Sequence, residues 1–272
     1  MRAREAVAIA VACVIVGVRT LATQQPTTPA ADSASPRRVQ PERPTVATHA
    51  GTVAPGLLEI ESGGERDRIA GATSFSSPTV FKIGLASHVQ LGILASLIRP
   101  PSGSVALGDV AAGVKWRLAD DAPILGDFAL LPTIKFPTGS SSTGTGTGTT
   151  DVALYAISSR QFGAVAMDLN VAYTHRSGDG TVAPTSATLW TVSFGGPFSG
   201  PLGWAVEWFG YPATSGRAGQ PSTVALLAGP TALVREWLSL DAGIIVPIAG
   251  PQPHALYAGV VYNVGRLWEA RR

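Results

Sequence analysis

The chain has 272 residues, which is room for one large β domain or two small ones. Charged residues make up only 14% of it, with 20 Lys and Arg against 18 Asp and Glu, while 31 residues are glycine. A chain this apolar and this evenly charged has no basic stripe, so we expect no nucleic-acid partner. The composition favours a protein whose outer surface does not face water.

The first 22 residues have the pattern of an export signal. Two arginines precede an apolar run of about 13 residues, Ala6 to Val18, and small residues follow as far as Ala22. The run is short for a membrane span, which takes roughly 20 residues. We therefore predict a signal peptide over residues 1–22, cleaved near Ala22. Cys13 is the only cysteine and lies inside it, so the mature chain has no thiol.

Residues 23–54 predict a tether rather than a folded domain. The stretch TQQPTTPAADSASPRRVQPERPTVAT is rich in Pro, Thr, Ala and Ser and has no apolar period. Such a segment buries too little apolar surface to offset its ordering entropy. We expect a disordered periplasmic tether over residues 23–54 and a folded domain over residues 55–268.

From residue 57 onward the chain divides into short segments that alternate apolar and polar residues and are bounded by turn residues, which predicts β-strands. Twelve such segments are expected, an even number, as bacterial membrane barrels require. They are Leu57–Gly63, Thr79–Gly84, His88–Ser96, Asp109–Leu118, Asp127–Phe136, Asp151–Arg160, Ala164–His175, Ala187–Gly195, Leu202–Tyr211, Thr223–Leu233, Leu238–Ile248 and His254–Val264. Pro132, Pro230 and Pro247 fall inside or near the ends of these strands and imply bulges, because proline donates no ladder hydrogen bond.

The alternation indicates which strand face meets which environment. Within 202–211, for example, Trp204 and Trp208 share one face and Glu207 lies on the other. A β-sandwich in water shows the same alternation with its apolar face inward. Here the polar face is poor in charge and rich in small residues, and aromatic residues gather near segment ends, as at membrane interfaces. We therefore predict an all-β, up-and-down antiparallel transmembrane barrel of about twelve strands, with a soluble periplasmic β-sandwich as the alternative.

Loop lengths give an independent indication. With the tether in the periplasm, the odd connections face outside and include long stretches such as ESGGERDRIAGATSFSSP and PTGSSSTGTGTGTT. The even connections include short ones such as QFG and VREW. Long outer loops with short periplasmic turns are typical of bacterial outer-membrane barrels, so we expect the protein in the outer membrane of a Gram-negative-type bacterium.

Residues 105–176 resemble an exported family associated with the meta-pathway of phenol degradation. The resemblance is carried by GDVAAGVKWRL, FALLPTIKFPTG, a Gly/Ser/Thr-rich loop and TDVALYAISSRQFGAVAMDLNVAYTH, in that order. It implies an outer-membrane barrel that transports hydrophobic or aromatic compounds, and it supplies no catalytic site. The Phe-Pro-Thr-Gly strand end is a mild departure from the Leu-Pro-Thr-Gly-like sequence of the family.

Polar residues on the inward faces are the candidate lumen lining. We interpret their mixed charges either as setting solute selectivity or as an internal salt-bridge network that fills a narrow barrel. The set is Lys82, His88, Gln90, Lys115, Arg117, Lys135, Asp151, Asp168, Asn170, Glu207, Asp241 and Asn263.

The sequence indicates no catalytic, cofactor or metal site. A Ser/His pair near His175 is geometrically possible, but no Gly-x-Ser-x-Gly elbow accompanies it and no two histidines have ligand spacing. The expected partners are outer-membrane lipid and a small solute, and the expected state is a monomer. We predict a passive channel for small hydrophobic or aromatic molecules, with a sealed structural or adhesive barrel as the alternative.

Overall fold

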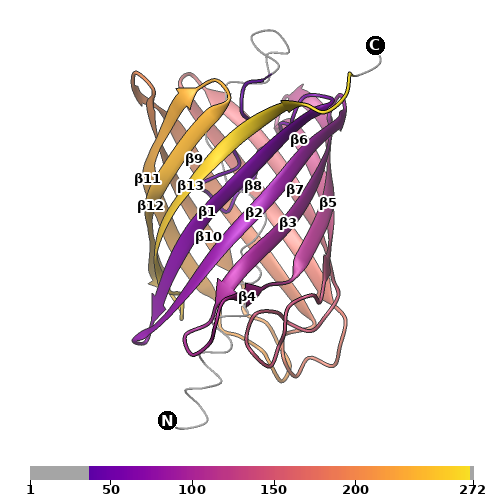
Figure 1. Ribbon diagram of the computed structural model, residues 1–272, viewed down its shortest axis with the longest axis vertical. Helices are drawn as coiled ribbons and strands as arrows, with labels where there is room; N and C mark the ends of the chain where they lie inside the picture. The colour runs from indigo at the N-terminus through magenta and orange to yellow at the C-terminus, as the bar shows by residue number, and fades with distance from the viewer. Residues whose placement is uncertain (1–36, 270–272) are drawn as a thin grey trace.

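A computed structural model describes residues 37–269. Within them the chain forms thirteen strands, of which β4 has only two residues, so twelve build the wall. Figure 1 shows the closed, tilted barrel that they make. The strands are β1 (Leu57–Ile69), β2 (Ala72–Ala86), β3 (Val89–Arg99), β4 (Ala106–Leu107), β5 (Val110–Ala122), β6 (Gly126–Phe136), β7 (Asp151–Phe162), β8 (Val165–Arg176), β9 (Ser186–Ser199), β10 (Leu202–Tyr211), β11 (Thr223–Arg235), β12 (Leu238–Ala249) and β13 (His254–Arg266).

A single antiparallel sheet closes on itself. Neighbouring strands pair in chain order from β5 to β13, β13 pairs with β1, and the β2–β3 pairing completes the ring. Closure leaves the wall without an exposed sheet edge, which is the condition for strands to cross a membrane. The predicted twelve-stranded barrel is confirmed, and the β-sandwich alternative is wrong, because a sandwich needs two facing sheets.

The two faces of the wall have the distribution expected in lipid rather than in water. Large apolar side chains face outward and stay exposed, such as Trp116 at 57% and Val171 at 52%. Charged side chains of the same wall point inward and are buried, such as Lys82 at 0% and Glu207 at 0%. In water this arrangement would be costly on both faces, whereas lipid outside favours it.

The connections divide into two classes by length, as Figure 1 shows with the longer loops at its lower end. The longer ones are residues 100–109, which contain β4, and 137–150, 177–185, 212–222 and 250–253; the short turns opposite are 87–88, 123–125, 163–164, 200–201 and 236–237. The first predicted outer loop is wrong. Instead of an 18-residue loop, β1 and β2 continue as paired strands to a tight turn at Ala70 and Gly71, both with positive φ.

Prolines coincide with interruptions of the β-ladder. Pro132 lies where the β5–β6 pairing breaks between Gly113 and Trp116, and Pro230 lies where the β11–β12 pairing breaks between Ala228 and Thr231. A proline lacks the N–H that a paired position needs, so each ladder is interrupted on one side only. Pro247 lies beyond the last β12–β13 pair, at Ile245, which explains its tolerance there.

The predicted tether is corrected over its second part. The export signal and residues 23–36 lie outside the described residues, but residues 37–54 are described and do not form a disordered tether. Most of them are buried inside the barrel, and Figure 1 shows them in indigo within the half next to the short turns. Composition failed here because polar groups of the barrel wall, rather than apolar packing of the segment itself, hold this stretch in place.

Candidate functional site

Residues 37–56, called the inner segment from here on, form a re-entrant loop in the lumen. Val39 donates its N–H to the carbonyl of Glu236 in a short turn (2.7 Å), and Gly56 donates to the carbonyl of Gly84 at the same end of the barrel (2.8 Å). Between these two anchors the chain dips inward and returns before β1 begins. The inner segment therefore enters and leaves at the end that carries the short turns.

The barrel wall holds the inner segment by its backbone. Side-chain oxygens from six different positions accept N–H groups of the segment, and Glu207 accepts two, from Val46 and Ala47, at 2.6 Å each. Asn170 both accepts from the Thr48 N–H (2.7 Å) and donates to the Thr48 carbonyl (2.9 Å). The accepting residues are Glu59, Glu61, Gln90, Ser159, Asn170 and Glu207. These contacts satisfy a non-regular backbone inside a membrane barrel, where unpaired N–H groups would be costly.

Buried ion pairs add to these backbone contacts. The Lys82 ammonium lies 2.7 Å from Glu59 and 2.5 Å from Glu61, all three on the wall. Lys115, also on the wall, pairs with Glu42 of the inner segment and donates to the carbonyl of His49 at 2.9 Å. Each charge in these pairs thus has an opposite charge beside it, which is the condition under which it can be retained.

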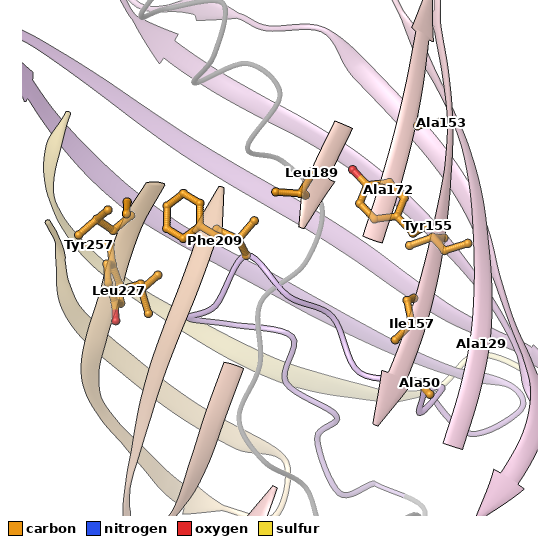
Figure 2. Close-up of a cluster of buried hydrophobic side chains, with 14 of the residues drawn as sticks. Ala50, Ala129, Ala153, Tyr155, Ile157, Ala172, Leu189, Phe209, Leu227 and Tyr257 are labelled. Carbon is orange, nitrogen blue, oxygen red and sulfur yellow. The ribbon is translucent and has the colours of Figure 1, made fainter. Parts of the chain in front are cut away.

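Part of the inward face between the inner segment and the long loops is apolar. Phe209 follows Glu207 by two positions on β10, and Tyr257, Leu227 and Leu189 lie on neighbouring strands of the same side. Figure 2 shows these side chains pointing from the strands into the barrel, with Ala50 of the inner segment at the edge of the group. Apolar side chains inside the barrel are not required for its insertion into a membrane, because the outer face alone contacts the lipid. We call this group the apolar band.

The end with the long loops carries a second charged group. Lys135 lies 2.5 Å from Asp109 and 3.5 Å from Asp151, and Arg176 lies 3.2 Å from Asp151. The Asp109 carboxylate also accepts the N–H groups of Gly139 and Thr147, both at 3.0 Å. Residues 137–150, the mouth loop, are thereby tied to the barrel. Part of the Ser/Thr/Gly tract packs around this carboxylate, with Thr145 and Thr147 buried, while residues 140–143 stay exposed.

The structure brings most of the predicted lumen residues into this arrangement. Six of them contact the inner segment: Lys82, Gln90, Lys115, Asn170, Glu207 and Asp241. Two others, Lys135 and Asp151, lie at the mouth. Asp168 accepts a hydrogen bond from Ser159, Arg117 forms ion pairs with Asp120 and Asp127, and Asn263 is buried. His88 differs, because it lies in the β2–β3 turn with φ 66° and its side chain is 42% exposed. A strand period cannot place a turn residue, so His88 does not line the lumen.

Sequence reasoning missed the residues of the inner segment itself. Glu42 and Arg43 belong to the stretch predicted as tether, yet both are buried and paired with wall residues. The Pro-rich stretch around these two residues shows no regular alternation of apolar and polar positions, so the sequence does not indicate that they are buried. Glu59 and Glu61 were discoverable, since they lie on the predicted first strand two positions apart and so share one face.

Among residues 37–269, no group of three or more His, Cys, Asp or Glu side chains could hold a metal ion. The same part of the chain contains no helix long and apolar enough to cross a membrane.

Comparison with known proteins establishes the class of fold. No family model and no curated protein matches this chain. Among solved structures, the COG4313 outer membrane channel from Pseudomonas putida F1 is 13% identical, covers 79% of this chain and 97% of its own, and has a TM-score of 0.61. The NanC porin is 10% identical over 76% of this chain and 98% of its own, with a TM-score of 0.54. The KdgM porin is 9% identical over 75% and 98%, with a TM-score of 0.50.

These likenesses show the fold alone. The chain has the architecture of the outer-membrane β-barrels, with neighbours that are channels and porins. Membership of the phenol meta-pathway family stays a prediction.

Proposed function

We propose that this protein is an outer-membrane channel for passive uptake of small hydrophobic or aromatic molecules. The observation that carries the proposal is the apolar band. Phe209, Leu227 and Tyr257 face the lumen and form one apolar cluster that also includes Val46 and Ala50 of the inner segment. A path for sugars or ions would be lined by polar groups along its length, whereas an apolar, aromatic lining favours solutes that leave water readily.

The inner segment implies that passage requires a change in its position. It contacts wall residues on several strands, among them Glu61 on β1, Gln90 on β3, Asn170 on β8 and Glu207 on β10. It is held by hydrogen bonds and ion pairs rather than by a continuous strand. We propose that the segment restricts the lumen at rest and moves during transport, with no cofactor and no catalytic step.

The remaining assignments follow from this proposal. The barrel would lie in the outer membrane of a Gram-negative-type bacterium as a monomer, with its long loops outside and its outward apolar face in contact with lipid. The second candidate is a sealed barrel with a structural or adhesive role. The buried network around the inner segment favours this alternative, because it could serve purely to stabilise a narrow barrel.

Uptake of a hydrophobic fluorescent naphthylamine by intact cells separates the two candidates. Cells producing the protein should take up the dye faster than cells with an empty vector. Leu227→Gln, which places a polar amide in the apolar band, should reduce the rate toward that of the vector. Leu226→Gln is the matched control, since Leu226 is adjacent and points to the opposite face of β11.

Folding of each variant is checked by its heat-modifiable mobility in outer-membrane fractions. A folded wild-type protein that gives only the vector rate would refute the channel and favour the sealed barrel. Equal loss in both variants would show that the effect does not arise in the lumen.

A further inference from the structure

Arg43 of the inner segment occupies a defined socket in the barrel wall. Its Nε lies 3.2 Å from Asp241 Oδ2, and its Nη2 donates to Oδ1 at 3.2 Å. Both side chains are buried, with 9% and 4% of their surface exposed. This is the two-point geometry in which a carboxylate recognises a planar guanidinium.

Two glycines form the floor of the socket. Gly259 on β13 pairs with Asp241 on β12 and also with Gly63 on β1, so the three positions make one row across three strands. A Cβ on Gly259 would lie 2.2 Å from Arg43 Nε, and one on Gly63 would lie 2.5 Å from its Cζ. The guanidinium plane fits only because both positions lack a side chain. We call Asp241, Gly259 and Gly63 the socket.

Asp241 differs from Glu59 and Glu61 in where its neutralising cation comes from. Glu59 and Glu61 receive a cation from the wall itself, through Lys82. The ion pair of Asp241 is made with Arg43, which belongs to the inner segment. When the segment moves, Asp241 loses that cation, and a carboxylate left without a partner in such a site strongly favours a replacement.

The neighbours of the socket indicate what the replacement would look like. Tyr257 lies two positions from Gly259 on β13 and belongs to the apolar band, and Ile245 on β12 belongs to the same buried cluster. A solute arriving from the long-loop end would therefore meet apolar side chains before it meets the carboxylate. A ligand that satisfies both carries a cationic head on an apolar body.

We propose that the socket is a lumenal binding site for solutes with a guanidinium or primary ammonium group on an apolar body, and that Arg43 occupies it at rest. This inference rests on the proposed channel function and extends its solute class to apolar molecules that carry one cationic group. Such a solute competes with Arg43 for Asp241, so its binding favours release of the inner segment. The solute can shift the equilibrium between the held and released segment only by the difference in its binding free energy for these two states.

Calorimetric titration of the full chain, folded in detergent micelles, tests the site directly. The probe is n-butylguanidinium, and N-butylurea is its neutral counterpart of similar shape. Arg43→Ala should bind n-butylguanidinium at least tenfold more tightly than the wild-type, because its socket is vacant. The double variant Arg43→Ala with Asp241→Asn should lose at least tenfold in affinity relative to Arg43→Ala, or about 1.4 kcal/mol.

Arg37→Ala is the matched control. It removes another arginine of the inner segment, one that donates to a backbone carbonyl, at Asn263, instead of a carboxylate. Its affinity should equal that of the wild-type. If Arg43→Ala does not fold, Arg43→Gln takes its place, since it keeps a donor and removes the charge.

Two outcomes would overturn the proposal. One is equal affinity of Arg43→Ala, or of Arg43→Gln, with and without Asp241→Asn. The other is equal binding of the urea and the guanidinium. Failure here is distinguishable from failure of the channel, because calorimetry reports binding whether or not the dye enters cells.

Discussion

Replacing Glu207 with glutamine removes one of the two carboxyl oxygens that hold the middle of the inner segment. The carboxylate accepts the N–H groups of Val46 and Ala47 at 2.6 Å each, and the residue is 0% exposed. A buried N–H group that is left without its acceptor costs about 1–3 kcal/mol. A glutamine oxygen can accept one N–H while its NH₂ group faces the other. We expect the held state to lose about 2 kcal/mol, roughly a 30-fold change in its equilibrium with the released state.

Thiol labelling measures that equilibrium. Ala50→Cys, in a chain that also carries Cys13→Ser, places the sole thiol on a residue of the inner segment that is 0% exposed. When release is fast relative to labelling, the rate of reaction with a maleimide follows the released population. Glu207→Gln should therefore raise the labelling rate by roughly 30-fold.

The control is Glu236→Gln, which makes the same chemical change on an exposed residue. Glu236 contacts the inner segment through its backbone carbonyl and not through its side chain. A Glu207→Gln labelling rate within twofold of the wild-type rate would show that the two hydrogen bonds to Glu207 do not hold the segment. An equal increase in Glu236→Gln would show that the effect is not specific to the lumen.

Three further changes test the mouth, the packing and the membrane face. Asp109→Asn should loosen the mouth loop and speed its cleavage by proteinase K about tenfold. The variant loses a charged acceptor, and each hydrogen bond to such a group contributes about 1.5–3 kcal/mol. Ser142→Ala, at an exposed position of the same loop, should leave the cleavage rate unchanged. Gly84→Ala should lower the midpoint temperature of heat-modifiable unfolding, since the new Cβ would lie 2.1 Å from a backbone oxygen of the inner segment. Gly92→Ala should leave that temperature unchanged, because the nearest atom to its Cβ would be 3.9 Å away. Val171→Arg, at a position 52% exposed on the middle of β8, should destabilise the barrel in liposomes by about 2–4 kcal/mol; an unchanged unfolding free energy would contradict the lipid-facing assignment.

Local chemistry was enough to predict the wall. Alternation at period two placed Lys115 and Glu207 on the inward faces and Trp208 on an outward one, and the structure agrees. The signal is strong because every strand meets two different environments over its whole length. The first hairpin was predicted less well. Polar residues such as Glu65 and Arg68 look like a loop, but cross-strand pairing with β2 keeps them extended.

The site was predicted in part for the same reason. A period identifies which wall residues point inward, so it found Asp241 and Asn170, but it cannot say what they contact. Arg43 and Glu42 come from a stretch with no period at all. Their places depend on wall residues up to 198 positions away along the chain, as in the Arg43–Asp241 pair.

The sequence by itself determined the class of protein, because lipid outside and polar groups inside impose a repeating pattern that survives in a single chain. It also determined most of the unequal loop lengths at the two ends, although not the tight turn between β1 and β2. Only the tertiary structure decided that residues 37–56 fold back into the lumen and that the Ser/Thr/Gly tract is tied to Asp109. Both depend on hydrogen bonds and ion pairs between segments far apart in the chain, and such contacts have no local signature. Closure of the barrel brings these groups together, and the function proposed for the lumen depends on them.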